Sequence, residues 1–303
     1  MQTEPPPVVH AEVSLAEDVL SLGEPIVLRY TFVVTQAEGV SLYMGRDKTG
    51  WITFTLTDVG GNLAPSIPDP RMRQGGIHST GIGASAGNHP VEYAVVNRLL
   101  RPTHPGGHRL SAHVQIPYAT WSQSSQMGVA PSQWGEVLGT ILTREDTFAL
   151  TITELDPARL RAVAERLAEQ AVQEDAPAHG KFALQALFAM PGEYVLPVWQ
   201  AVTTSENPRL LNQWGVISDE LARVQTAHTA DLLAEMHWNP PQAVRDRLNI
   251  RSRGDMNLNP MAMNNIALKF NNMYFTANPP LKQHLEEIQR AHGSGAPESR
   301  MVI

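Results

Sequence analysis

The period of the apolar residues changes in the middle of the chain, at Asp156-Pro157. Before this point, short segments such as residues 8–15 alternate apolar and polar side chains, which is the period of a strand with one buried face. After it, apolar residues between 160 and 171 recur at spacings of three and four, the period of an amphipathic helix. Asp156 can cap that helix, and Pro157 suits its first turn because no hydrogen bond is lost there. The sequence therefore predicts a β-rich half followed by a helical half.

Several segments of the first half have strand character and are separated by turn-forming residues. They lie at residues 8–15, 26–34, 40–44, 51–57, 91–100, 108–116 and 147–155. Many short strands in close succession are typical of an antiparallel sandwich. We therefore expect a β-sandwich domain over residues 1–155.

Short helical segments follow in the second half, in pairs with breaks between them. Residues 183–190 and 194–202 make one pair, and residues 210–224 and 229–238 make another. Paired short helices favour a HEAT-like α-solenoid, which we expect over residues 156–292. The Gly-, Ser- and Pro-rich end at residues 293–303 predicts a flexible tail.

Three stretches of the first half carry a resemblance to a bacterial module: LSLGEPIVL at 20–28, LYMGRD at 42–47 and WITF at 51–54. They resemble the immunoglobulin-like sandwich of intracellular proteinase inhibitor-type proteins, which HEAT-like helices follow in exported bacterial proteins. The resemblance implies an N-terminal antiparallel immunoglobulin-like sandwich, a C-terminal HEAT-like helical domain and a periplasmic or secreted location. It supplies no catalytic residue. The chain departs from that pattern at residues 97–100, where NRLL replaces an aromatic-rich strand.

The composition excludes several kinds of chemistry. The 303 residues include no cysteine, which excludes disulfides, thiolate metal sites and cysteine nucleophiles. The 30 acidic and 23 basic residues give a net charge of −7 without any basic run, so we expect no nucleic-acid partner. No apolar stretch reaches about 18 residues, so we expect no membrane span. Residues 1–7 lack the apolar segment of a signal peptide, which favours a mature N-terminus.

The segment GASAG at residues 83–87 spells the nucleophile elbow of α/β-hydrolases, with Ser85 at its centre. An elbow needs a buried strand directly before the serine and a helix directly after it. Charged and glycine residues precede this segment, and Asn88-His89-Pro90 follows it, so an inter-strand loop is the favoured interpretation. The alternative is a hydrolase in which Ser85 is the nucleophile and His89 or His104 is its base.

Five of the eleven histidines lie within 36 residues, at His78, His89, His104, His108 and His113. Imidazoles that converge at one end of a sheet can bind zinc or copper. His104 and His108 flank a Pro-Gly-Gly turn, so they can face each other, but Glu92 is the nearest acidic companion. Histidines on surface loops remain the other interpretation. The candidate metal ligands are His78, His89, His104 and His108.

Trp121 and Trp134 lie in an insertion rich in Ser, Gln and Gly, at residues 120–135. Such an insertion does not easily bury two indoles, and exposed tryptophans anchor many interfaces. The other interpretation is that both rings fold back over the edge of the sandwich or onto the helical domain. We therefore expect a non-catalytic binding or scaffold protein without a cofactor, which engages a protein partner through the solenoid face and the loop that carries Trp121 and Trp134. One alternative is a carbohydrate-binding module whose tryptophans stack on sugars. The other is a hydrolase that uses Ser85 or a histidine-bound metal.

Overall fold

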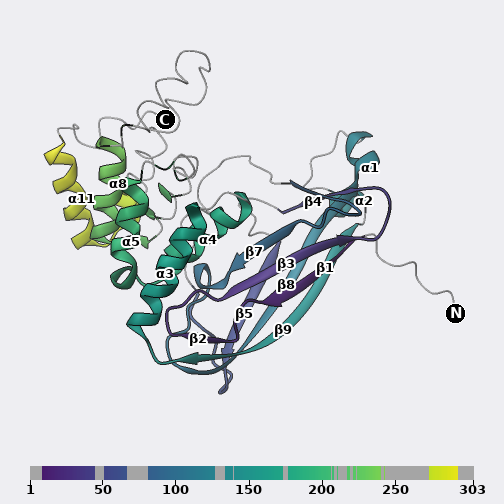
Figure 1. The fold of residues 1–303 in the computed structure, drawn as a ribbon, viewed down its shortest axis with the longest axis horizontal. Coiled ribbons are helices and arrows are strands. Elements are labelled where there is room, and N and C mark those ends of the chain that lie inside the picture. Colours follow the sequence, from purple (N-terminus) through teal and green to yellow (C-terminus); the bar gives the residue numbers. More distant parts are fainter. Residues whose placement is uncertain are drawn as a thin grey trace, which may run out of the picture. The chain divides into compact units, whose positions relative to one another are not determined.

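The chain divides into two compact units, Met1–Asp156 and Pro157–Ile303. Figure 1 shows the computed structural model, with the strands in the first unit and the longer helices in the second. The structure describes residues 9–44, 51–66, 81–126, 134–138, 140–172, 177–205, 207, 210, 217–218, 221–222, 224–239, 242 and 273–292.

The smaller sheet of the first unit has three antiparallel strands in the order β1-β3-β7. They are β1 (Val9–Leu15), β3 (Val27–Val34) and β7 (Val91–Val95). In β3 the buried side chains Leu28, Tyr30, Phe32 and Val34 alternate with more exposed ones, because successive residues of a strand point to opposite faces.

The larger sheet is organised around β8, a strand of 15 residues. β8 pairs antiparallel with β9, β5 and β4, whereas the short β2 runs parallel to β9. β6 pairs with β4 at the other edge. The strands are β2 (Val19–Ser21), β4 (Val40–Tyr43), β5 (Ile52–Asp58), β6 (Gly81–Ala84), β8 (Gly106–Thr120) and β9 (Ile141–Thr153).

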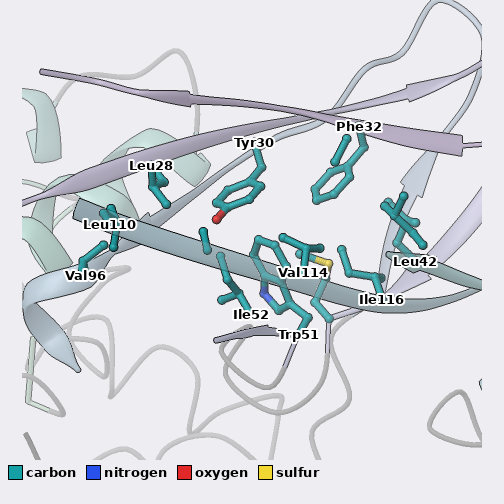
Figure 2. Close-up of a cluster of buried hydrophobic side chains, with 14 of the residues drawn as sticks. Leu28, Tyr30, Phe32, Leu42, Trp51, Ile52, Val96, Leu110, Val114 and Ile116 are labelled. Atoms are coloured by element: carbon teal, nitrogen blue, oxygen red, sulfur yellow. The ribbon is translucent and has the colours of Figure 1, made fainter. Parts of the chain in front are cut away.

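Side chains from both sheets form one apolar core, part of which Figure 2 shows. The Trp51 ring meets Tyr30 edge-on, with ring centroids 4.8 Å apart. The Tyr30 hydroxyl and the Trp51 Nε1 are buried and have no hydrogen-bond partner among the described residues. Burial, together with the nearby charge of Asp146, raises the pKa of Tyr30 above its ordinary value. β8 contributes a row of buried side chains to this core: Leu110, Ala112, Val114 and Ile116.

Helices lie among the strands as well as after them. The 3₁₀-helix η3 (Val96–Arg98) follows β7, and α1 (Trp121–Gln126) and α2 (Trp134–Leu138) separate β8 from β9. The helices of the second unit are α3 (Pro157–Val172), α4 (Pro177–Ala189), α5 (Gly192–Thr204), α8 (Ala227–Trp238) and α11 (Pro279–Ala291). None of these described helices is both long and apolar enough to span a membrane.

The predicted start of a helix at Pro157 is confirmed, because α3 begins there. The expected apolar stripe of this helix is buried, as Leu160, Val163 and Leu167 show. At the N-terminus of α8, the Thr226 hydroxyl accepts the Thr229 N–H and the Thr229 hydroxyl accepts the Thr226 N–H, which satisfies two backbone donors.

The predicted fold class is wrong. We expected an N-terminal antiparallel immunoglobulin-like sandwich followed by a HEAT-like helical domain, whereas the fold is mixed α/β with helices interspersed among the strands. The described helices form no obvious solenoid, and β2 pairs in parallel. Local periods identify strands and helices one at a time, but they carry no information on which elements pair. The expected helix at 210–224 lies mostly outside the described residues, and the expected tail at 293–303 lies wholly outside them.

Candidate functional site

Trp121 stands at the point where β8 ends and α1 begins, and about half of it (49 %) is exposed. The backbone N–H of Trp121 donates a hydrogen bond to the Gly39 carbonyl oxygen at 3.0 Å. A Cβ atom at position 39 would lie 2.5 Å from two carbons of the indole. The ring therefore packs directly against the backbone of residue 39, where only glycine leaves enough space for it.

The first turn of α1 is held by hydrogen bonds on both sides of Trp121. The Thr120 N–H donates to the Gln123 side chain at 2.9 Å, and the Gln123 N–H donates to the Thr120 hydroxyl at 3.3 Å. This reciprocal pair has the arrangement of a capping box. The Ser122 N–H donates to the Glu38 carboxylate at 2.7 Å. Hydrogen bonds from Ser122 lower the pKa of Glu38, so this carboxylate is ionised at neutral pH and holds α1 to the segment before β4.

Trp134, the second predicted binding residue, is placed differently. It begins α2 and is buried, with 7 % exposed. Its Nε1 has no hydrogen-bond partner among the described residues. The structure therefore leaves one indole of the insertion open to a partner, that of Trp121, and not the predicted pair.

A polar cluster lies at the opposite end of β8. The His104 Nε2 is 3.2 Å from Asp58 Oδ2, and the His104 and His108 rings have centroids 5.4 Å apart. Asp58 is the last residue of β5 and pairs in register with His108. Residues that are directly opposite each other in an antiparallel pair share one face of the sheet. Asp58, His104 and His108 are therefore neighbours, and we call them the Asp-His cluster.

Further hydrogen bonds orient each member of the Asp-His cluster. The His108 Nδ1 donates to the Gly106 carbonyl oxygen at 3.1 Å, and the Thr103 hydroxyl lies 3.2 Å from His104 Nδ1. The Asn62 side chain and backbone N–H each donate to Asp58 at 2.8 Å. These two bonds from Asn62 lower the pKa of Asp58 below its ordinary value, with a smaller contribution from His104. The carboxylate is therefore ionised at neutral pH.

Of the four predicted metal ligands, His104 and His108 are brought together. His78 lies outside the described residues, and His89 lies between the turn that ends at Asn88 and the start of β7. Within the part of the chain that the structure describes, no three His, Asp or Glu side chains are placed so that they could hold a metal ion. Asp58 is the acidic companion that the sequence analysis missed. Its signal was the hairpin turn DVGGN, which marks the end of a strand but not the partner of that strand.

Ser85 lies in a tight turn between two strands. Its N–H donates to the Asn88 carbonyl oxygen at 3.1 Å, and the Asn88 N–H donates back to the Ser85 carbonyl oxygen at 2.9 Å. Gly87 has a φ of +87°, which the turn requires and which glycine adopts at no steric cost. The preceding strand β6 is antiparallel to β4, and β7 rather than a helix follows. This geometry is that of the predicted inter-strand loop and not of a nucleophile elbow.

Comparison with known proteins gives no relative from which residue roles can be transferred. No family model matches the chain, and no curated protein matches it either. The resemblance to the inhibitor-type module therefore stays a prediction, and the fold class that it implied is wrong.

Proposed function

We propose that this chain is a non-catalytic binding protein that engages a protein partner through Trp121. The observation that carries the proposal is the half-exposed indole, fixed against the backbone of Gly39. Tryptophan is enriched at the centres of interfaces because it buries a large apolar area at a low cost in side-chain entropy. A ring that is already fixed before binding loses still less freedom when a partner covers it.

The surroundings of Trp121 favour a protein partner over a carbohydrate. The carbohydrate alternative used both tryptophans of the insertion, and Trp134 is buried. A single ring offers little stacking area to a polysaccharide. Glu38, Ser122 and Gln123, which are polar, adjoin Gly39 and Trp121 in the sequence, and polar residues around an apolar anchor are typical of an interface rim. The turn geometry of Ser85 lends no support to the hydrolase alternative.

The proposal is tested with matched variants at the two ends of β8. Trp121→Ala removes the proposed anchor. Leu63→Ala removes a side chain that is also exposed, at 69 %, but lies next to Thr57 near the Asp-His cluster. A partner is first captured on the immobilised full chain, and the Kd of the purified partner is then measured for each variant. We expect Trp121→Ala to weaken binding by about tenfold or more, as for an interface hot spot, and Leu63→Ala to leave the Kd unchanged.

Two results would contradict a protein partner. The first is a Kd that neither substitution alters, because the anchor would then lie elsewhere. The second is retention of the chain on an insoluble polysaccharide that only Trp121→Ala abolishes, which would favour the carbohydrate alternative. Near-UV circular dichroism of both variants checks that the fold is intact.

A further inference from the structure

We propose that Arg144 and Asp146 prevent a second copy of this chain from pairing with the side of β9 that faces away from β8. On one side β9 pairs with β8 over residues 141–152, and on the other side the short β2 covers only residues 151–153. Among the described strands, none pairs with residues 141–150 on that second side, which we call the β9 edge. An unpaired edge presents backbone donors and acceptors to which another strand can add.

The pattern of β9 would otherwise favour such pairing. Its even-numbered side chains face the core, because successive residues of a strand point to opposite faces. The apolar ones are buried in the core or packed against it: Leu142, Phe148, Leu150 and Ile152. Arg144 and Asp146 occupy the two positions between Leu142 and Phe148. Without these charges, an uninterrupted apolar stripe would follow the β9 edge, and such edge strands associate readily.

Arg144 and Asp146 form a bidentate ion pair on this core-facing side. The Arg144 Nε and Nη2 donate to the two carboxylate oxygens of Asp146 at 2.6 and 2.7 Å. The hydrogen bond to Asp146 raises the pKa of Arg144, and the charge of Glu12 on β1 adds a smaller contribution. Burial and the charge of Asp146 together raise the pKa of Tyr30, which is fully buried. The pair therefore lies at the border between the core and the β9 edge, and both members are charged at neutral pH.

The pair remains in contact with water, and this makes an added strand costly. The Arg144 side chain is 38 % exposed and that of Asp146 is 16 % exposed. A second β9 on this edge would remove that water from the charges of both copies. The loss of hydration of an ion pair can exceed the attraction between its charges. Inward-pointing charges are one of the features by which natural sheets protect their edge strands.

The test is the mass of full-chain variants in solution, measured by size-exclusion chromatography with light scattering over a range of concentrations. Arg144→Leu combined with Asp146→Leu completes the apolar stripe. We expect this leucine pair to form species of about twice the wild-type mass or more, in a share that rises with concentration. Arg144→Asp combined with Asp146→Arg exchanges the two charges and keeps both on the inward face, so this swapped pair should keep the wild-type mass.

Glu145→Leu is the matched control on the same strand. Glu145 lies between the two charges but points to the opposite, exposed face, so its substitution should keep the wild-type mass. Amide hydrogen exchange locates the contact, because residues 141–150 of the leucine pair should exchange more slowly at high concentration than at low concentration. Near-UV circular dichroism checks the fold. If the leucine pair does not fold, Arg144→Val combined with Asp146→Val replaces it, since valine favours strands.

The rival account is that the ion pair only stabilises β9, which predicts no change of mass when the charges are removed. A leucine pair that keeps the wild-type mass would therefore overturn the proposal. So would a swapped pair or a Glu145→Leu variant that associates as strongly as the leucine pair, because the inward charges would then not be the cause. The proposal does not depend on a protein partner at Trp121.

Discussion

The two ends of β8 carry a half-exposed indole and a polar cluster, and they are built differently. At the C-terminal end, α1 follows the strand at once, and the Trp121 indole rests on the backbone of Gly39, which is distant in the sequence. At the N-terminal end, three polar side chains from two separate segments meet because β5 pairs with β8 in one register. Both placements depend on contacts between segments that are distant in the sequence, so local patterns alone specify neither of them.

Both ends of β8 contain an ionised carboxylate whose hydrogen bonds fix a neighbouring segment. Glu38 accepts the Ser122 N–H and fixes α1, while Asp58 accepts both donors of Asn62 and fixes the loop after β5. In each case the acceptor is charged and at least one donor is a backbone N–H, which makes a stronger hydrogen bond than a neutral pair. The ends differ in the ring that lies nearby, a half-exposed indole at Trp121 or the exposed imidazole of His104.

The largest expected effect comes from a substitution within β8, between the two ends. Leu110 is fully buried in the core that both sheets share. Leu110→Ala should reduce the free energy of unfolding by about 2–5 kcal/mol, because it removes apolar contacts and leaves a cavity. Urea unfolding measures this loss, and we expect partner binding to fail as the chain unfolds. A free energy of unfolding equal to that of the wild-type chain would contradict the burial of Leu110 in the shared core.

Two glycines, Gly39 and Gly107, test how tightly each end of β8 is packed. A Cβ at Gly39 would lie 2.5 Å from the Trp121 ring, which is fixed, so Gly39→Ala should displace the indole and destabilise the chain by about 1–3 kcal/mol. A Cβ at Gly107 would lie 3.0 Å from a methyl of Val59, whose side chain is 89 % exposed and can move aside. Gly107→Ala should therefore change stability by no more than about 0.5 kcal/mol.

Denaturant unfolding of the two glycine variants, with the indole N–H signal of Trp121 followed by NMR, checks this contrast. Gly39→Ala should shift that signal and Gly107→Ala should not. Equal effects of the two substitutions would mean that the indole is not held by residue 39, which would weaken the case for a preorganised anchor.

Local patterns were sufficient to predict the individual elements. The alternation in residues 8–15 predicted β1, and Val9 and Ala11 are buried as that pattern requires. The change of the apolar period at Asp156-Pro157 predicted the start of α3. These signals succeed because burial of one face acts on residues that are close in sequence. The same signals failed for α1 and α2, which are six and five residues long and have no apolar period to detect.

Long-range contacts account for what the sequence analysis missed. Asp58 and His104 are 46 residues apart, and nothing in either segment specifies the register that joins them. Trp134 was a candidate binding residue because its neighbours are small and polar, yet it is buried, as the other interpretation of the insertion predicted. A side chain in a polar insertion is covered or exposed according to what it packs against, which composition does not encode. The fold class failed for the same reason, since parallel pairing of β2 with β9 leaves no local mark.

The smallest expected effect is the response of each end of β8 to acid, which depends on Glu38 at one end and on Asp58 at the other. The pKa values of Glu38 and Asp58 are both lowered in the folded chain, by hydrogen bonds from Ser122 and Asn62 respectively. A lowered pKa in the folded state contributes stability that is fully present above the unfolded pKa, about 4 for these groups, and is lost as the pH falls through the folded value. We therefore expect both loops to loosen only below about pH 4. Glu38→Gln should remove this acid response from the Trp121 indole N–H signal and leave the His104 ring signals unchanged, and Asp58→Asn should do the reverse. An acid response at both ends that one substitution abolishes would show that the two loops are coupled through β8, and the ends could then no longer be treated as separate sites.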